Sequence, residues 1–278
     1  MMNKLNKSRI SLIISMIIFG SIGVFVKNIE LRSSEIALYR AIIAVLLIGL
    51  LLFATKQKIS FCKIKKEIPF LLLSGFAMGF NWILLFQSYK YTTVSVATLS
   101  YYFAPVIVIL ACPFLFKEKM SIKQWICFIM SSLGIVIITG IGDLNKGSNH
   151  IVGIAFGLGA AVLYASVILL NKYIKNVTGI HRTFLQFVAA AAVLLPYVLL
   201  TGGIHIGELS TKSFFLLMIV GVVHSGIAYC LYFSSLGKLS GQKTAMLSYI
   251  DPLVAVIASV AILGEPITIP QILGGVLI

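Results

Sequence analysis

Charged residues are scarce in this chain of 278 residues, of which only 11% are Asp, Glu, Lys or Arg. A soluble globular domain carries about 25% charged residues. Here 59% of the residues are hydrophobic, and the mean hydropathy is +1.05. The composition therefore excludes an ordinary soluble domain and identifies the lipid bilayer as the first partner of the chain.

The sequence also lacks the motifs of disulfide frameworks and of common enzymes. It contains four cysteines but no CxxC pair, and three of them lie inside apolar runs. There is no HExxH and no GxSxG, and Lys243-Thr244 lacks the glycines of a phosphate loop. We therefore expect no enzyme, no metal site and no cofactor.

Basic residues outnumber acidic ones, giving a net charge of +14, but they are scattered in short gaps between apolar runs. This distribution argues against a nucleic-acid partner and indicates a signal for membrane orientation. With the N-terminus in the cytoplasm, 16 of the 22 basic residues fall in inner segments, five in outer segments, and Arg40 within a span. The sequence thus predicts a multi-pass protein of the cytoplasmic membrane with a cytoplasmic N-terminus.

Ten apolar runs are present, and a membrane-spanning helix needs about 20 such residues. The runs are Arg9–Val26, Ser34–Phe53, Ile68–Gln87, Thr93–Phe116, Ser121–Gly140, Ile151–Leu170, His181–Leu200, Lys212–Ser234, Gly241–Leu263 and Ile267–Ile278. They predict an all-α integral membrane protein with ten transmembrane helices. The tenth run is too short to cross a bilayer, so we expect this helix to be truncated in the present sequence.

A weak internal repeat relates the two halves of the chain at a fixed offset of 147 positions. The identical pairs are Gly79/Gly226, Phe86/Phe233, Ser88/Ser235, Tyr102/Tyr249, Pro105/Pro252, Ala111/Ala258, Glu118/Glu265 and Gln124/Gln271. They predict two repeats, residues 1–140 and 151–278. Each repeat holds five spans, an odd number, so the second is expected to be inverted relative to the first.

Several motifs resemble one known family. They are Phe19-Gly20 with Lys27, Arg40, Ala104-Pro105, Lys117-Glu118, His224-Ser225-Gly226-Ile227-Ala228-Tyr229, Tyr249-Ile250-Asp251-Pro252 and Leu263-Gly264-Glu265-Pro266. Together they resemble the EamA-type branch of the drug/metabolite transporter superfamily. The resemblance implies a duplicated five-helix unit that transports small-molecule solutes.

Three ionisable residues inside predicted spans need an explanation, because each costs about 2.5 to 3.5 kcal/mol at the bilayer centre. Asp251 either binds a cationic group, exchanges a coupling proton, or is a buried acid held by a neighbouring helix. His224 either exchanges protons at physiological pH or is a satisfied interhelical histidine. On an α-helix it would share a face with Val220, Gly221, Ala228 and Leu231.

Arg40 either holds a substrate carboxylate or pairs with an acid on another helix, such as Asp251. The nearest acid in sequence, Glu35, lies about 140° away around the helix and is a poor partner. Glu118 and Glu265 are expected to close the fourth and ninth helices by bonding exposed amides of the helix that follows.

Two prolines, Pro105 and Pro252, are expected to break their helices near the midplane, where transporters built from inverted repeats bind substrate. Other polar or aromatic residues could line such a site, although aromatic residues in membrane helices more often pack or face lipid. These further candidates are Asn81, Trp82, Tyr101, Tyr102, Tyr164, Gln186, Tyr229, Ser248 and Tyr249.

The sequence favours a secondary transporter that moves a small organic metabolite by alternating access. The family resemblance suggests an amino acid or related compound and the direction of export. The alternatives are a passive channel, a solute-binding membrane sensor and, least favoured, an intramembrane enzyme.

Overall fold

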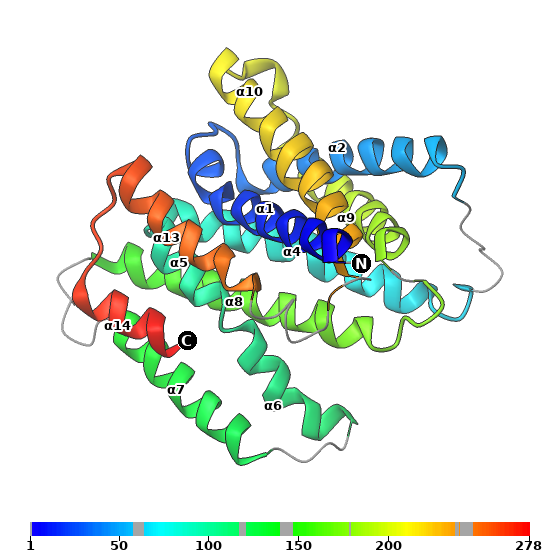
Figure 1. Ribbon diagram of the computed structural model, residues 1–278. Helices are drawn as coiled ribbons and strands as arrows, with labels where there is room; N and C mark the ends of the chain where they lie inside the picture. The colour runs from blue at the N-terminus through cyan, green and yellow to red at the C-terminus, as the bar shows by residue number, and fades with distance from the viewer. Residues whose placement is uncertain are drawn as a thin grey trace.

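The computed structural model describes residues 2–57, 64–116, 121–139, 147–177, 179–236, 239 and 247–278. Within these ranges the regular structure is entirely helical (Figure 1). Seven helical stretches are long and apolar enough to cross a membrane, and shorter apolar helices cover Ile122–Ile137 and Ile250–Leu263. The expected class, an all-α integral membrane protein, is confirmed.

The helices follow the predicted apolar runs closely. The α-helices are α1 (Met2–Lys27), α2 (Ser33–Ala54), α4 (Ile68–Tyr91), α5 (Val94–Tyr101), α6 (Ala104–Phe116), α7 (Ile122–Thr139), α8 (Gly147–Asn171), α9 (Gly179–Thr201), α10 (Thr211–Ile219), α11 (Ala228–Leu236), α13 (Ile250–Leu263) and α14 (Ile269–Leu277). A short 3-10 helix, η2 (Ile206–Glu208), precedes α10, and a π-helix, η3 (Val220–Ile227), joins α10 to α11.

The central helix α4 packs against α2, α8 and α9, and α1 packs against α11 and α13. Small residues allow the close contacts. A Cβ atom at Gly75 of α4 would lie 2.4 Å from the Ala189 Cβ of α9, so only glycine permits this approach. The buried core includes Phe86 and Phe187, while large apolar residues such as Phe53 and Leu200 are exposed, as lipid-facing positions require.

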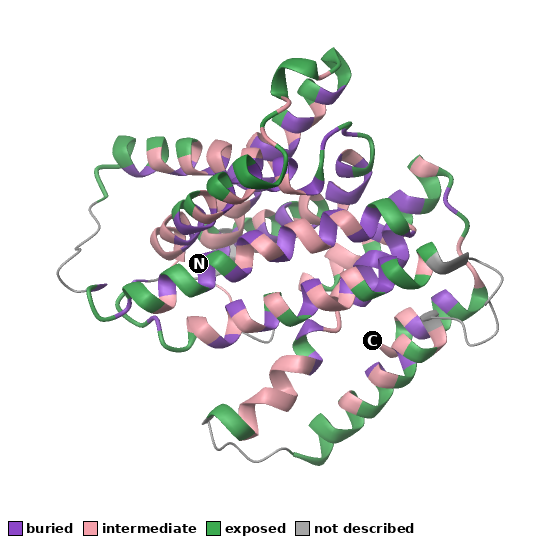
Figure 2. Ribbon diagram, turned by 180° about the vertical axis from the view of Figure 1, so that it is seen from behind, coloured by how far each residue is buried: buried purple, intermediate pink, exposed green. Residues whose placement is uncertain are grey.

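Two helices extend from the edge of this central group, and α6 contacts it at α8. In Figure 1, α6 and α7 extend away from the other helices, and α7 packs against α14. Figure 2 shows the same contrast in burial, with most buried residues in the central helices and mostly exposed residues along α7. The tightly packed part of the molecule is therefore the group that contains α1, α2, α4, α8 and α9.

The fourth apolar run is interrupted in its middle. Helix α5 ends at Tyr101 and α6 begins at Ala104, so Pro105 is the second residue of α6. Proline has no N–H to bond the carbonyl of Tyr101 one turn earlier, which explains why a continuous helix stops here. In the ninth run α13 begins at Ile250, and Pro252 is its third residue. The start of that run, residues 241–246, lies outside the described residues.

The eighth apolar run departs from the predicted α-helix. Residues Val220–Ile227 form a π-helix, so the α-helical face assigned above to His224 is wrong. A π-helix widens the turn and changes which side chains share a face. Here the backbone of η3 also approaches α2 closely, because a Cβ at Gly221 would lie 2.8 Å from the Ile43 Cβ.

Candidate functional site

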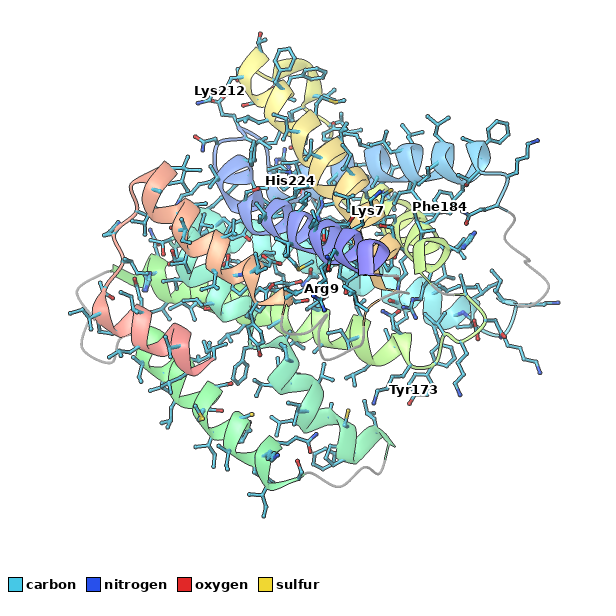
Figure 3. The ribbon with its side chains drawn as sticks, viewed as in Figure 1. Lys7, Arg9, Tyr173, Phe184, Lys212 and His224 are labelled. Atoms are coloured by element: carbon cyan, nitrogen blue, oxygen red, sulfur yellow. The ribbon has the colours of Figure 1, made fainter. Side chains whose placement is uncertain are left out.

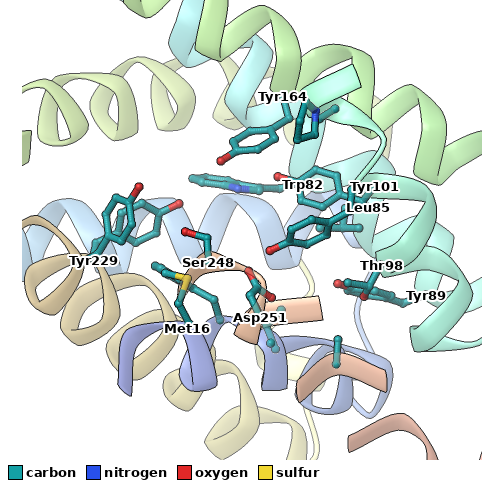
Figure 4. Close-up of a pocket in the computed structure, with 18 of the residues that line it drawn as sticks. Met16, Trp82, Leu85, Tyr89, Thr98, Tyr101, Tyr164, Tyr229, Ser248 and Asp251 are labelled. Atoms are coloured by element: carbon teal, nitrogen blue, oxygen red, sulfur yellow. The ribbon is translucent and has the colours of Figure 1, made fainter. Parts of the chain in front are cut away.

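A cavity of about 300 Å³ lies where α1, α2, α4, α5, α6, α8, α11 and α13 meet. Its walls are rich in aromatic side chains that come from both halves of the sequence (Figure 4). These aromatic residues are Phe19, Trp82, Tyr89, Tyr101, Tyr102, Tyr164, Tyr229 and Tyr232. A concave site with mainly apolar walls and a few polar groups is typical of small-molecule binding.

Asp251 supplies a carboxylate to this cavity. It lies in the first turn of α13, where the positive end of the helix dipole favours an acidic group. The Tyr102 side chain hydrogen-bonds the Asp251 side chain, and Ser248 lines the cavity beside it. Gly20 allows α1 to pack closely against α13 at this point, because a Cβ there would lie 2.4 Å from the Asp251 carbonyl oxygen.

Arg40 supplies a cation to the same cavity. Its side chain is 4% exposed, and Nε donates to the Ser225 Oγ at 2.6 Å. The guanidinium carbon lies 4.5 Å from the centre of the Trp82 ring and 5.7 Å from that of Phe86. Within the described ranges no carboxylate forms an ion pair with Arg40, so the pairing with Asp251 considered above is not formed in this structure.

Nine of the candidate residues named from the sequence line the cavity. They are Arg40, Trp82, Tyr101, Tyr102, Pro105, Tyr164, Tyr229, Ser248 and Asp251. Tyr89 also lines it and was not named, although it lies seven residues after Trp82 on the same face of α4. Tyr232 follows Tyr229 by three residues on α11, so helical spacing could have identified both.

Three polar candidates lie elsewhere and bond neighbouring helices. His224 is 1% exposed and sits where η3 meets α1, with Nε2 3.1 Å from the Ser21 Oγ (Figure 3). Asn81 donates to the Ala160 carbonyl at 2.6 Å, and Gln186 donates to the Ser74 hydroxyl at 2.5 Å. These contacts agree with the interhelical alternative stated for His224.

The two remaining candidates also lie outside the cavity lining. Tyr249 is 58% exposed, and Pro252 follows Asp251 without lining the cavity. Residues that are adjacent in sequence therefore differ in whether they line the cavity: Ser248 and Asp251 do, and Tyr249 and Pro252 do not. Ser248 and Asp251 are three residues apart, the spacing that places two side chains on the same face of a helical segment.

Glu265 joins several elements near one end of α13. Its carboxylate accepts bonds from the Lys27 ammonium and the Ser259 hydroxyl, and from the Val94 amide at 2.8 Å. Val94 is the first residue of α5, where helix amides lack intrahelical partners. The prediction that Glu265 bonds an amide of the following helix is therefore wrong, because its amide partner is Val94 of α5, in the first half of the chain. Glu118 lies outside the described residues.

The fold and the polar cavity inside it define a multi-pass membrane protein with a site for a small molecule. The model of the EamA-like transporter family matches residues 7–140 and again residues 151–278. The chain belongs to this family, within the drug/metabolite transporter superfamily, and is a membrane transporter rather than an enzyme. The double match indicates duplicated halves.

Relatives support the same assignment. The chain is 34% identical over 273 residues to the "Uncharacterized transporter YxxF" of Bacillus subtilis, covering 97% of this chain and 86% of the relative. It is 24% identical over 204 residues to "Protein RarD" of Salmonella typhi, covering 73% and 67%. A solved crystal structure shares the fold at a TM-score of 0.66 and 14% identity, covering 97% of this chain and 94% of that one.

Proposed function

We propose that this protein is a secondary transporter that carries a small amine-bearing metabolite, an amino acid or a related compound, out of the cell. The observation that carries the proposal is Asp251 in an aromatic-walled cavity inside the helix bundle. A carboxylate in that environment binds an ammonium group or a proton strongly, because little water competes for it.

The size of the cavity supports a small solute. A volume of about 300 Å³ is at the lower end of ligand pockets. Tyrosine and tryptophan walls suit an ammonium group, which is attracted to aromatic faces, and they suit an apolar side chain equally well. The metabolite we propose is therefore one amino acid in size rather than a nucleotide or an oligopeptide.

The proposed mechanism is alternating access between two inverted halves, residues 1–140 and 151–278. The internal repeat, the odd number of predicted spans in each half and the helix breaks before Pro105 and near Pro252 support it. Elements of both halves contribute to the cavity, so a movement of one half against the other would change which side of the membrane it opens to.

The proposed location is the cytoplasmic membrane, with the N-terminus inside. The excess of basic residues in the predicted inner segments supports this orientation. Single cysteines placed at Thr55 and Tyr173, in a cysteine-free background, should react from the same face of the membrane. Labelling from opposite faces would exclude the inverted arrangement.

The central test is counterflow in proteoliposomes loaded with a mixture of unlabelled L-amino acids. Labelled external amino acid should accumulate transiently against its gradient, because a carrier exchanges solute faster than it returns empty. A passive channel shows no such trans-stimulation. A sensor that only binds would show no flux, so each alternative function has its own outcome.

A further inference from the structure

We propose that Arg40 forms a carboxylate-binding subsite, so that the transported solute must carry a carboxylate as well as an amine. This inference rests on the proposed function and narrows its substrate class. It depends on the donors of Arg40 that remain unused, on the orientation of Ser225, and on the aromatic rings beside the guanidinium.

Four N–H donors of the Arg40 guanidinium have no acceptor in the part of the chain that the structure describes. Arginine carries five, of which the Nε–H is donated to Ser225. No acceptor for Nη1 or Nη2 is found among the residues that the structure describes, and the residue lines the cavity. A buried cation without an anionic partner is costly, and a solute carboxylate would supply that partner with two parallel hydrogen bonds.

Ser225 is oriented to accept from Arg40. Its hydroxyl donates its single proton to the Val220 carbonyl at 3.1 Å, five residues earlier, so its lone pairs face the Arg40 Nε–H. This bond spans the widened turn of the π-helix, and the serine is fully buried. A neutral acceptor fixes the position of the guanidinium and leaves its positive charge uncompensated. A carboxylate partner would neutralise that charge.

The aromatic rings of Trp82 and Phe86 hold the guanidinium on another side. Their centres lie 4.5 Å and 5.7 Å from its central carbon, within the range of cation–π contacts. Such contacts stabilise a cation without occupying its N–H donors. Ser225, Trp82 and Phe86 therefore restrict Arg40 to one position and leave the donors of its terminal nitrogens available to the cavity.

Arg40 and Asp251 together place one positive and one negative group around the same cavity, without an ion pair between them. A zwitterion can satisfy both groups at once. An amine that lacks the carboxylate would leave Arg40 without an anion, and an acid that lacks the amine would leave Asp251 without a cation. We therefore expect the site to bind both more weakly than the zwitterion.

Thermal stabilisation of the purified full chain tests this selectivity, because a ligand that binds the folded state raises its Tm. The probes are L-phenylalanine, L-leucine and L-methionine, each compared with the amine that remains when its carboxylate is removed. At least one amino acid should bind about tenfold or more tightly than its amine, as expected when a charged hydrogen-bonding partner is lost.

Variants assign the selectivity to the proposed groups. Arg40→Lys keeps the charge but removes the planar fork, and it should lose most of the preference for the amino acid over its amine. Ser225→Ala should weaken amino-acid binding several-fold while amine binding stays unchanged, and Ser225→Thr should restore it. Ser234→Ala, an exposed serine on the adjoining α11, is the matched control.

The outcomes separate this inference from the function on which it rests. If amines bind as tightly as their parent amino acids, or if Arg40→Lys and Ser225→Ala leave the preference intact, the carboxylate subsite is refuted while an amine transporter stands. If no amino acid and no amine stabilises the wild-type protein, the proposed substrate class fails and the subsite fails with it. The Tm of each variant without ligand identifies any loss of folding.

Discussion

Glu265 and Arg40 are both buried charged residues, but their surroundings differ. Glu265 accepts bonds from Lys27, Val94 and Ser259, which together satisfy its carboxylate. Among the residues that the structure describes, Ser225 alone accepts a hydrogen bond from Arg40, which also faces a cavity and aromatic rings. A charge that the protein satisfies fully serves to hold helices together, whereas one with spare donors beside a cavity is available to a ligand.

Glu67 and Glu35 show that the first kind of environment recurs. Glu67 accepts bonds from the amides of Lys175 and Asn176, and Glu35 accepts one from the His205 amide. In each case the carboxylate joins segments that are more than a hundred residues apart in sequence. The contrast with Arg40 therefore reflects a difference of role, between joining helices and facing a cavity.

The largest expected effect is on stability, from Glu265→Ala. This change removes the carboxylate that accepts from the Val94 amide and leaves the Lys27 ammonium with the Thr92 carbonyl but no anionic partner. It should cost about 3 kcal/mol of unfolding free energy. Thermal unfolding in detergent measures it. Glu208→Ala, at an exposed acid, is the control and should leave the Tm unchanged. Equal stability of the two variants would contradict a structural role for Glu265.

Gly20→Ala should disturb the wall that carries Asp251. The new methyl group would lie 2.4 Å from the Asp251 carbonyl oxygen and 2.8 Å from the Val254 Cβ, so α1 and α13 must separate. Overpacking of this kind costs about 2 kcal/mol. Both the Tm and the transport rate should fall. Gly207→Ala, where no atom lies within 4 Å of the added carbon, should change neither.

Asp251→Asn should lower amino-acid transport about tenfold or more, because a hydrogen bond to a charged group contributes about 1.5 to 3 kcal/mol. The protein should remain folded and inserted, since asparagine has nearly the same shape. Counterflow and its pH dependence measure the change. Transport that is unaltered in rate and in pH dependence would remove Asp251 from the mechanism.

The smallest effect is expected from Tyr249→Phe. The ring of Tyr249 is largely exposed, outside the cavity, although its neighbours Ser248 and Asp251 line it. Loss of the hydroxyl group should leave transport within about twofold of wild type, as is usual for surface substitutions. A tenfold loss would show that the site extends beyond the cavity described here.

Much of the fold follows from the sequence. The run Ser34–Phe53 corresponds to α2, and the prediction of a membrane transporter is confirmed. The structure departs from the prediction where the type of helix differs from the expected α-helix. The π-helix at Val220–Ile227 has no signal in the hydrophobic pattern, because an apolar run looks the same whichever helix it forms.

The candidate site was predictable in part. Arg40 and Asp251 attract notice because charges are costly in lipid, and both line the cavity. His224, Asn81 and Gln186 attract notice for the same reason, because they are polar residues inside spans. In the structure, however, they bond neighbouring helices. Sequence cannot separate the two groups, because the bonding partners come from distant parts of the chain.

Hydrophobicity is a local property that adds along the chain, so the sequence by itself determined that this protein spans the membrane with helices and where most of them lie. The tertiary structure alone decided how each helix is rotated and which neighbour it meets. That rotation surrounds Glu265 with donors and leaves Arg40 facing the cavity. The physical reason is that polar groups in lipid must find partners across helices, and those partners exist only after packing.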